Sequence, residues 1–144
     1  DDLKQYRPGI KAIQELGLHS PLLEANMTKK EIRELAADYD LKAANKPSSP
    51  CLATRFPYHT LLNYEEMRKV EKIEDYLHAC GFYNVRARIH NDLVRLEIDQ
   101  DAFMKCMDYR QEIVLFIKEL GYDYVTLDLE GFRSGSQDIK LEEK

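Results

Sequence analysis

The stretch Val85-Arg86-Ala87-Arg88-Ile89-His90-Asn91-Asp92-Leu93-Val94-Arg95-Leu96-Glu97-Ile98 decides the fold of this chain. On either side of Asn91-Asp92, apolar and polar residues alternate with period two, which is typical of strands with one buried face. Two turn residues between two such runs predict a tight antiparallel hairpin with one apolar and one charged face. The cross-strand pairs expected on the charged face are Arg86 with Glu97, Arg88 with Arg95, and His90 with Leu93.

The charged face carries like charges in contact, because Arg88 is placed directly opposite Arg95, and such a pair destabilises a sheet. One interpretation is a solvated face of long side chains that splay apart. The other is a phosphate or carboxylate site, since the planar guanidinium group binds both. The segment Leu129-Glu130-Gly131-Phe132-Arg133-Ser134-Gly135-Ser136 favours the second interpretation. A turn with two glycines, two hydroxyls and an arginine can present backbone N–H groups to an anion.

The elements around the hairpin predict the fold class. The order after residue 50 is a candidate strand at Cys51–Phe56, a helix from about Asn63 to Cys80, the hairpin, a long helix from near Asp101 to Leu120, and a strand at Tyr124–Leu129. This order predicts an α+β fold with a split βαβ (ferredoxin-like) layer whose helices cover one face of the sheet.

The first 45 residues read as a separate helical region. Pro8-Gly9 opens a helical pattern, and Thr28 with Glu31 three residues later predicts a capping box at the start of a second helix. The stretch Asn45–Pro50, which has two prolines and two serines, is the best candidate boundary. We therefore expect one region over residues 1–45 and a second over residues 46–144.

Composition excludes several classes of protein. The 144 residues include 21 Lys+Arg and 26 Asp+Glu, which gives a net charge of −5, and 44% of them are apolar. A net acidic chain lacks the basic surface that generic binding of nucleic acid or anionic membranes requires. No apolar run approaches the roughly 18 residues that span a bilayer, and no signal peptide opens the chain. A cytoplasmic location is expected.

The three cysteines, at widely spaced positions, fit neither a disulfide framework nor a zinc site. Cys80 and Cys106 fall within predicted helices, where a thiol usually acts as a small hydrophobe. Cys51 instead follows a proline in a loop, and the nearby Lys46 and Arg55 would favour its thiolate. Spacing alone leaves open whether Cys51 is reactive.

Glu74 lies at the edge of the apolar stripe of the helix predicted from Asn63. Its position has two interpretations: a carboxylate of a functional site, or an edge residue that keeps its head in water.

Four segments of this sequence, in this order, resemble the C-terminal half of the LarE-type ATP-dependent sacrificial sulfur transferases, a branch of the PP-loop ATP pyrophosphatases. They are Lys46–Tyr58 (which contains Cys51-Leu52-Ala53-Thr54-Arg55), Val85–Arg88, Arg95–Glu97 and Asp128–Ser136. By the same resemblance, Arg7-Pro8-Gly9 and the helix capped by Thr28 look like the end of the family's PP-loop α/β domain. No Ser-Gly-Gly-x-Asp-Ser loop occurs in these residues. We therefore expect a C-terminal part that is inactive without an N-terminal PP-loop domain.

The resemblance implies a reaction. The family is thought to adenylate a carboxylate of pyridinium biscarboxylic acid mononucleotide with ATP and Mg²⁺. A cysteine thiolate then displaces AMP, and cleavage of its C–S bond leaves a thiocarboxylate on the substrate and dehydroalanine in the protein. The product leads to the nickel-pincer cofactor of lactate racemase. Some relatives use a cysteine-bound iron–sulfur cluster instead, and the single cysteine of the motif here favours the sacrificial route.

The resemblance also implies roles for individual residues. Cys51 matches the sulfur donor. Glu74 and Glu97 match acids that can bind a divalent metal. The residues that match phosphate or substrate contacts are Thr54, Arg55, Arg86, Arg88, Arg133, Ser134 and Ser136. The expected partners are a nucleotide substrate, the PP-loop domain and further copies in a homo-oligomer.

A competing hypothesis is a non-catalytic anion-binding or RNA-binding module of another PP-loop enzyme, such as one that thiolates tRNA. The net charge of −5 and the scarcity of aromatic residues on the arginine face weigh against RNA.

Overall fold

The computed structural model describes residues 13, 15–46, 49–134 and 136. The whole motif match at Arg7–Gly9, most of the helical pattern that opens at Pro8, and the tail after Ser136 lie outside these residues. The chain forms two compact units, residues 1–48 and 49–144, which are described separately. No helix of the described part is both long and apolar enough to cross a membrane.

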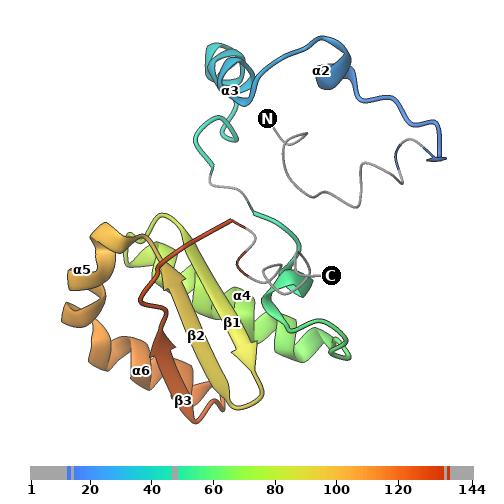
Figure 1. Cartoon of the computed structure of the whole chain (residues 1–144). Coiled ribbons are helices and arrows are strands. Elements are labelled where there is room, and N and C mark those ends of the chain that lie inside the picture. Colours follow the sequence, from blue (N-terminus) through green and yellow to red (C-terminus); the bar gives the residue numbers. More distant parts are fainter. Residues whose placement is uncertain (1–12, 14, 47–48, 135, 137–144) are drawn as a thin grey trace. The chain divides into compact units, whose positions relative to one another are not determined.

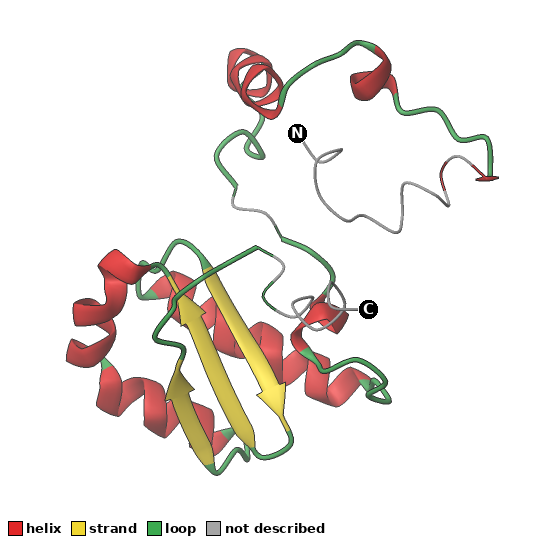
Figure 2. Cartoon of the chain, viewed as in Figure 1, coloured by secondary structure: helices red, strands yellow, loops and turns green. Residues whose placement is uncertain are grey.

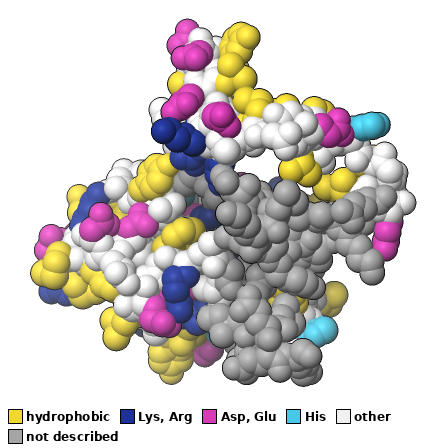
Figure 3. All heavy atoms as spheres, turned by 45° about the horizontal axis from the view of Figure 1, so that its top comes forward, with side chains coloured by type: hydrophobic (Ala, Val, Ile, Leu, Met, Phe, Trp, Pro, Cys, Tyr) yellow, Lys and Arg dark blue, Asp and Glu magenta, His cyan; other side chains and the backbone are white. Residues whose placement is uncertain are grey.

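The described part of the first unit contains the short helices α2 (Pro21–Glu24) and α3 (Lys29–Asp38) (Figure 1). The predicted capping box is confirmed, because the Glu31 backbone N–H donates to Thr28 Oγ1 at 3.3 Å and the Thr28 N–H donates to the Glu31 carboxylate at 2.7 Å. Neither helix buries a residue, and apolar side chains lie at the surface of this unit (Figure 3). The most exposed are Leu16, Leu18, Tyr39 and Leu41.

The second unit is a mixed α+β layer (Figure 2). Its elements are η2 (Leu52–Arg55), α4 (Tyr64–Ala79), β1 (Val85–His90), β2 (Leu93–Ile98), η3 (Gln100–Ala102), α5 (Phe103–Asp108), α6 (Arg110–Glu119) and β3 (Tyr124–Leu127). The predicted hairpin is confirmed in its register, with Arg86 opposite Glu97 and Arg88 opposite Arg95. The α+β class is therefore correct.

The sheet order differs from the expected one. The order is β1-β2-β3, and β3 pairs directly with β2 in parallel. In a split βαβ layer, another strand would lie between these two. The candidate strand at Cys51–Phe56 is wrong, because η2 there is a 3-10 turn. The ferredoxin-like detail is thus not confirmed in the described residues.

The core lies between the sheet and the helices, as the apolar face of the hairpin predicts. Val70, Ile73 and Leu77 of α4 are fully buried against it. The six apolar strand residues expected to face the helices are all buried: Val85, Ala87, Ile89, Val94, Leu96 and Ile98. α4 and α6 cover the same face, where Tyr76 stacks on Phe116 with ring centroids 4.4 Å apart. The other face is crossed by the segment after β3 (Figure 1).

The long helix expected from Asp101 to Leu120 is instead three pieces, and this prediction is wrong in detail. The break falls at Tyr109, whose ψ of 8° leaves the helical region, and the Arg110 guanidinium donates to the Met107 carbonyl at 3.0 Å. The break lets α5 bury Cys106 and α6 bury Ile117 in one core.

Candidate functional site

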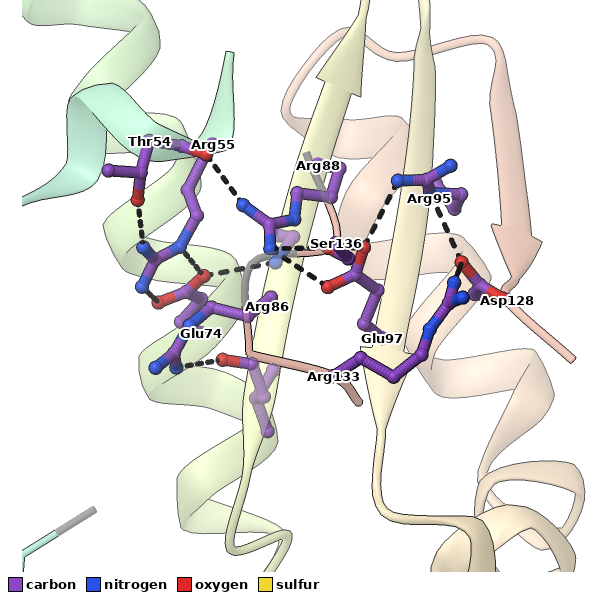
Figure 4. Close-up of polar contacts among 12 residues, drawn as sticks. Thr54, Arg55, Glu74, Arg86, Arg88, Arg95, Glu97, Asp128, Arg133 and Ser136 are labelled. Carbon is purple, nitrogen blue, oxygen red and sulfur yellow. Dashed lines mark hydrogen bonds and ion pairs between the residues drawn. The ribbon is translucent and has the colours of Figure 1, made fainter. Parts of the chain in front are cut away.

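The charged face of the hairpin is a buried polar network (Figure 4). Arg86 and Arg88 are each only 5% exposed and Glu97 is fully buried. The interpretation as a solvated face of splayed side chains is therefore wrong for these residues. We call Arg86, Arg88, Arg95 and Arg133 the arginine cluster.

Glu97 lies at the centre of the network. It forms an ion pair with Arg88 at 3.0 Å through Oε2 and accepts a hydrogen bond from Arg95 at 3.0 Å through Oε1. Ser136 Oγ donates to Glu97 at 2.8 Å and accepts from Arg88 at 2.8 Å. The like-charge pair Arg88 and Arg95 is thus tolerated because one carboxylate bridges it.

The segment after β3 brings Arg133 to the same face. Asp128 forms ion pairs with Arg133 at 3.3 Å and with Arg95 at 3.6 Å, and Glu130 pairs with Arg133 at 2.7 Å. Because Asp128 bridges Arg133 to Arg95, the network runs without interruption from β1 to this segment (Figure 4).

Arg86 completes the cluster. Its guanidinium lies over the Phe132 ring, 5.1 Å from the centroid, and donates to the Val85 carbonyl at 2.6 Å. Burial, with the charge of Arg55 nearby, lowers the pKa of Arg86. A bound anion would offset this cost of burying the cation.

Ion pairs join three arginines of the cluster to carboxylates: Glu97 pairs with Arg88 and Arg95, and Asp128 and Glu130 pair with Arg133. A phosphate or carboxylate group is the ligand that guanidinium groups bind best in a partly buried site.

Residues Cys51–Phe56, which we call the Cys51 turn, lie beside this network. Cys51 is exposed and immediately precedes η2. Its carbonyl accepts hydrogen bonds from Thr54 Oγ1 at 2.8 Å and from the Thr54 backbone N–H at 3.0 Å. The Thr54 carbonyl in turn accepts a hydrogen bond from Arg88 at 2.6 Å. The structure therefore joins the candidate sulfur donor to the arginine cluster.

Arg55 and Glu74 form a buried pair at the base of the Cys51 turn. Arg55 donates to both Glu74 oxygens, at 2.6 and 2.9 Å, and is only 1% exposed. The interpretation of Glu74 as an edge residue with its head in water is wrong, because α4 turns this carboxylate toward β1 and the Cys51 turn. The guanidinium of Arg55 is directed to Glu74 and Thr54, which does not fit a substrate contact.

The described residues around Glu74 and Glu97 do not provide the ligands that the expected metal ion would need. Both carboxylates are engaged by guanidinium groups, Glu74 by Arg55 and Glu97 by Arg88 and Arg95. The described residues contain no group of three His, Cys, Asp or Glu side chains that could hold a metal ion. These residues as arranged do not fit a metal site, and no step is derived through one.

The segment after β3 was expected to offer backbone N–H groups to an anion, and three of them are not available. The Glu130 N–H donates to Asp128 Oδ1, the Gly131 N–H to the Asp128 carbonyl and the Phe132 N–H to the Ile98 carbonyl. The segment contributes side chains instead, Arg133 and Ser136, while Ser134 is exposed. Gly135 lies outside the described residues.

Cys80 and Cys106 lie in surroundings that fit the small apolar side chains predicted for them. Cys106 is buried, and burial raises the pKa of its thiol. Cys80 is half-buried and packs against the core. Neither has the exposure of Cys51.

Four residues of the network were not predicted as site residues from the sequence: Arg95, Asp128, Glu130 and Phe132. Arg95 and Asp128 link the two halves of the arginine cluster, and Phe132 supports Arg86. The alternation of the hairpin already placed Arg95 on the charged face, so that signal was present. Asp128 and Phe132 were indicated only by their place in the segment Asp128–Ser136, which resembles the LarE-type family.

Comparison of the sequence with known proteins shows which proteins this chain is similar to. No family model matches the chain. Over 141 residues, 98% of the chain, it is 40% identical to pyridinium-3,5-bisthiocarboxylic acid mononucleotide synthase of Lactiplantibacillus plantarum. It is also 39% identical to an uncharacterised protein of Synechocystis sp. over 137 residues, which are 94% of the chain. It is 31% identical to an uncharacterised protein of Methanocaldococcus jannaschii over 134 residues, which are 93% of the chain. The chain spans about half the length of these curated relatives, 51%, 51% and 52%.

The described residues form an α+β module in which a buried arginine network lies beside the turn that begins at the exposed Cys51. The predicted resemblance to the LarE-type sulfur transferases is confirmed, since the chain is homologous over nearly its whole length to about half of that synthase.

Proposed function

We propose that this chain is the part of an ATP-dependent sulfur transferase that holds a pyridinium carboxylic acid mononucleotide and supplies sulfur from Cys51. The observation that carries the proposal is the contact between Arg88 and the Thr54 carbonyl, because this contact holds the turn that begins at the exposed cysteine against the arginine cluster. The relative's name, a synthase of a bisthiocarboxylic acid mononucleotide, supports this substrate class.

The arginine cluster binds the phosphate of the mononucleotide in this proposal. Arg86, Arg88 and Arg133 are the contacts expected from the family, and the planar guanidinium groups gathered on this face suit a phosphate group. The Ser136 hydroxyl accepts a hydrogen bond from Arg88, and the Thr54 hydroxyl accepts one from the neighbouring Arg55. ATP and Mg²⁺ act in a PP-loop domain, where adenylation of the substrate carboxylate releases pyrophosphate.

Cys51 then acts as the nucleophile. Its thiolate attacks the acyl carbon of the acyl adenylate, and AMP leaves with the bonding electrons. Loss of the Cys51 Cα proton leaves an electron pair that forms a Cα=Cβ bond as the Cβ–S bond breaks. The sulfur stays on the substrate as a thiocarboxylate, and dehydroalanine remains at position 51. The product would serve the nickel-pincer cofactor of lactate racemase.

The geometry favours one small anion over a nucleic-acid backbone. Proteins that grip nucleic acid neutralise several phosphates with exposed basic side chains. Here Arg86 and Arg88 are buried, and Arg95 and Arg133 are half-buried and ion-paired. The alternative of an RNA-binding module is less well supported for this reason.

Location and assembly belong to the same proposal. A cytoplasmic location would keep the Cys51 thiol reduced. The working enzyme would also contain an N-terminal PP-loop domain and further copies in a homo-oligomer.

Mass spectrometry tests the sacrificial role. An enzyme containing this chain and a PP-loop domain is incubated with ATP, Mg²⁺ and pyridinium biscarboxylic acid mononucleotide, and its cysteine peptides are analysed. We expect the Cys51 peptide to lose about 34 Da, the mass of H₂S, once per protein. Cys80 and Cys106 should keep their sulfur, and Cys80→Ala should behave like the wild type. Multiple turnovers with an intact Cys51, or full activity of Cys51→Ala, would reject the proposal.

A further inference from the structure

Glu74 links three elements of the second unit: α4, η2 and β1. It lies on α4, pairs with Arg55 of η2 through both carboxylate oxygens, and accepts a hydrogen bond from the Ala87 backbone N–H of β1 at 3.0 Å. β1 is an edge strand, and its outer N–H groups need partners. The Glu74 carboxylate therefore joins the sheet edge to the turn that precedes α4.

A continuous set of contacts leads from Glu74 to the sulfur donor. Arg55 Nη1 donates to Thr54 Oγ1 at 2.7 Å, and Thr54 Oγ1 donates to the Cys51 carbonyl at 2.8 Å. On the other side of the turn, Arg88 holds the Thr54 carbonyl. Thr54 is thus held from two directions, by Arg55 at its hydroxyl and by Arg88 at its carbonyl (Figure 4).

We propose that Glu74 is a positioning residue which, with Arg55, holds the Cys51 turn against β1, and that it is not a metal ligand. The functional meaning of this role rests on the proposed function, because sulfur transfer requires Cys51 at a fixed place beside the arginine cluster. The contacts of Glu74 with Arg55 and the Ala87 N–H, and of Arg55 with Thr54, are what we call the tether, and they exist without any reaction.

Charge and burial argue against a metal at Glu74. A cation at this carboxylate would have to displace the Arg55 guanidinium, which is 1% exposed and would be left buried without its carboxylate. Breaking a buried pair in this way is strongly unfavourable. A divalent cation also needs several oxygen ligands, and the described residues offer no such group.

Amide hydrogen exchange of the chain by NMR tests the tether. The probes are the amides of Thr54 and Phe56 in the turn and of Ala87 on β1, all hydrogen-bonded in the structure. Glu74→Ala should speed exchange of these three amides about tenfold or more, while amides of β2 keep their rates. Glu71→Ala, an exposed position on the same helix, is the matched control and should change none of them.

A second readout reports on Cys51 itself. Its alkylation rates with anionic iodoacetate and with neutral iodoacetamide are compared by peptide mass spectrometry. If the tether holds Cys51 beside the arginine cluster, the iodoacetate to iodoacetamide ratio should exceed that of free glutathione. The ratio should fall at least about twofold in Glu74→Ala, because the thiol moves away from the guanidinium groups.

A conservative variant covers the case in which Glu74→Ala fails to fold. Arg55→Lys keeps the charge but loses the planar fork that contacts both Glu74 oxygens. It should speed exchange at Thr54 and Phe56 and lower the alkylation ratio in the same way. These readouts need neither ATP nor substrate, so their failure is distinct from a failure of sulfur transfer.

Titration with Mn²⁺, followed by its EPR signal, decides between the two roles of Glu74. We expect no Mn²⁺ affinity that Glu74→Ala removes. Loss of Mn²⁺ binding in Glu74→Ala, or unchanged amide exchange in both Glu74→Ala and Arg55→Lys, would overturn the proposal.

Discussion

Arg88 Nη1 donates a hydrogen bond to the Thr54 carbonyl at 2.6 Å, which joins the middle of β1 to the turn that carries Cys51. The same guanidinium pairs with Glu97 and Ser136. One side chain therefore connects the Cys51 turn, the central carboxylate and the segment after β3.

Replacing Arg88 should cost stability as well as function. Arg88→Met leaves the fully buried Glu97 with Arg95 as its remaining ion pair and should lower the free energy of unfolding by about 3 kcal/mol. Urea denaturation measures this loss. Arg68→Met, an exposed position on α4, is the control and should stay within about 0.5 kcal/mol of the wild type. An Arg88→Met variant as stable as the control would contradict the network described here.

Gly131 determines how the segment after β3 returns over the sheet. Its φ is +74°, and a Cβ added there would lie 2.8 Å from Gln100 Cγ and 3.0 Å from the Ile98 carbonyl. Gly131→Ala should therefore destabilise the protein by about 1–3 kcal/mol and weaken anion binding at Arg133. Thermal unfolding and phosphate titration check the two effects. Gly121→Ala also has a positive φ but open space around it, so it should reproduce the backbone strain without the clash.

His90 should make stability depend on pH. Burial, with Arg95 and Arg88 nearby, lowers the pKa of His90 below its usual value of about 6.5. As the pH falls below 6.5, the unfolded chain therefore takes up a proton on this histidine before the folded protein does, and stability decreases. Unfolding by urea at about pH 7.5 and about pH 5.5 should show a smaller loss in His90→Gln than in the wild type. The exposed His59→Asn should lose as much as the wild type, and equal losses in all three would reject this role.

Local pattern was sufficient to predict the hairpin, its register and its core face. The alternation of Val85–Ile98 encodes which residues point to the helices, and the capping box at Thr28 uses residues three apart. Contacts between distant residues were not encoded in this way. Glu74 reads as an edge residue until Arg55, 19 positions earlier, is placed beside it.

The sequence pattern also failed to predict the order of the strands and the helix break. Element order alone does not say that β3 pairs directly with β2, because that depends on how α5 and α6 pack. The helix break at Tyr109 depends on tertiary packing, since Tyr109 itself does not stop a helix. The like charges of Arg88 and Arg95 predicted an anionic group that compensates them, and the Glu97 carboxylate pairs with both. A bound anion on this face stays a prediction.

The central claim is that an anion held by the arginine cluster lies within reach of Cys51. The most direct test is the rate at which iodoacetamide alkylates Cys51 in the presence of nicotinic acid mononucleotide, a pyridinium carboxylic acid mononucleotide. We predict that the mononucleotide slows alkylation of Cys51 in a saturable way, leaves Cys80 unaffected, and needs about a tenfold higher concentration in Arg86→Met. Alkylation of Cys51 that stays unchanged at every mononucleotide concentration, or protection that survives intact in Arg86→Met, would contradict the claim.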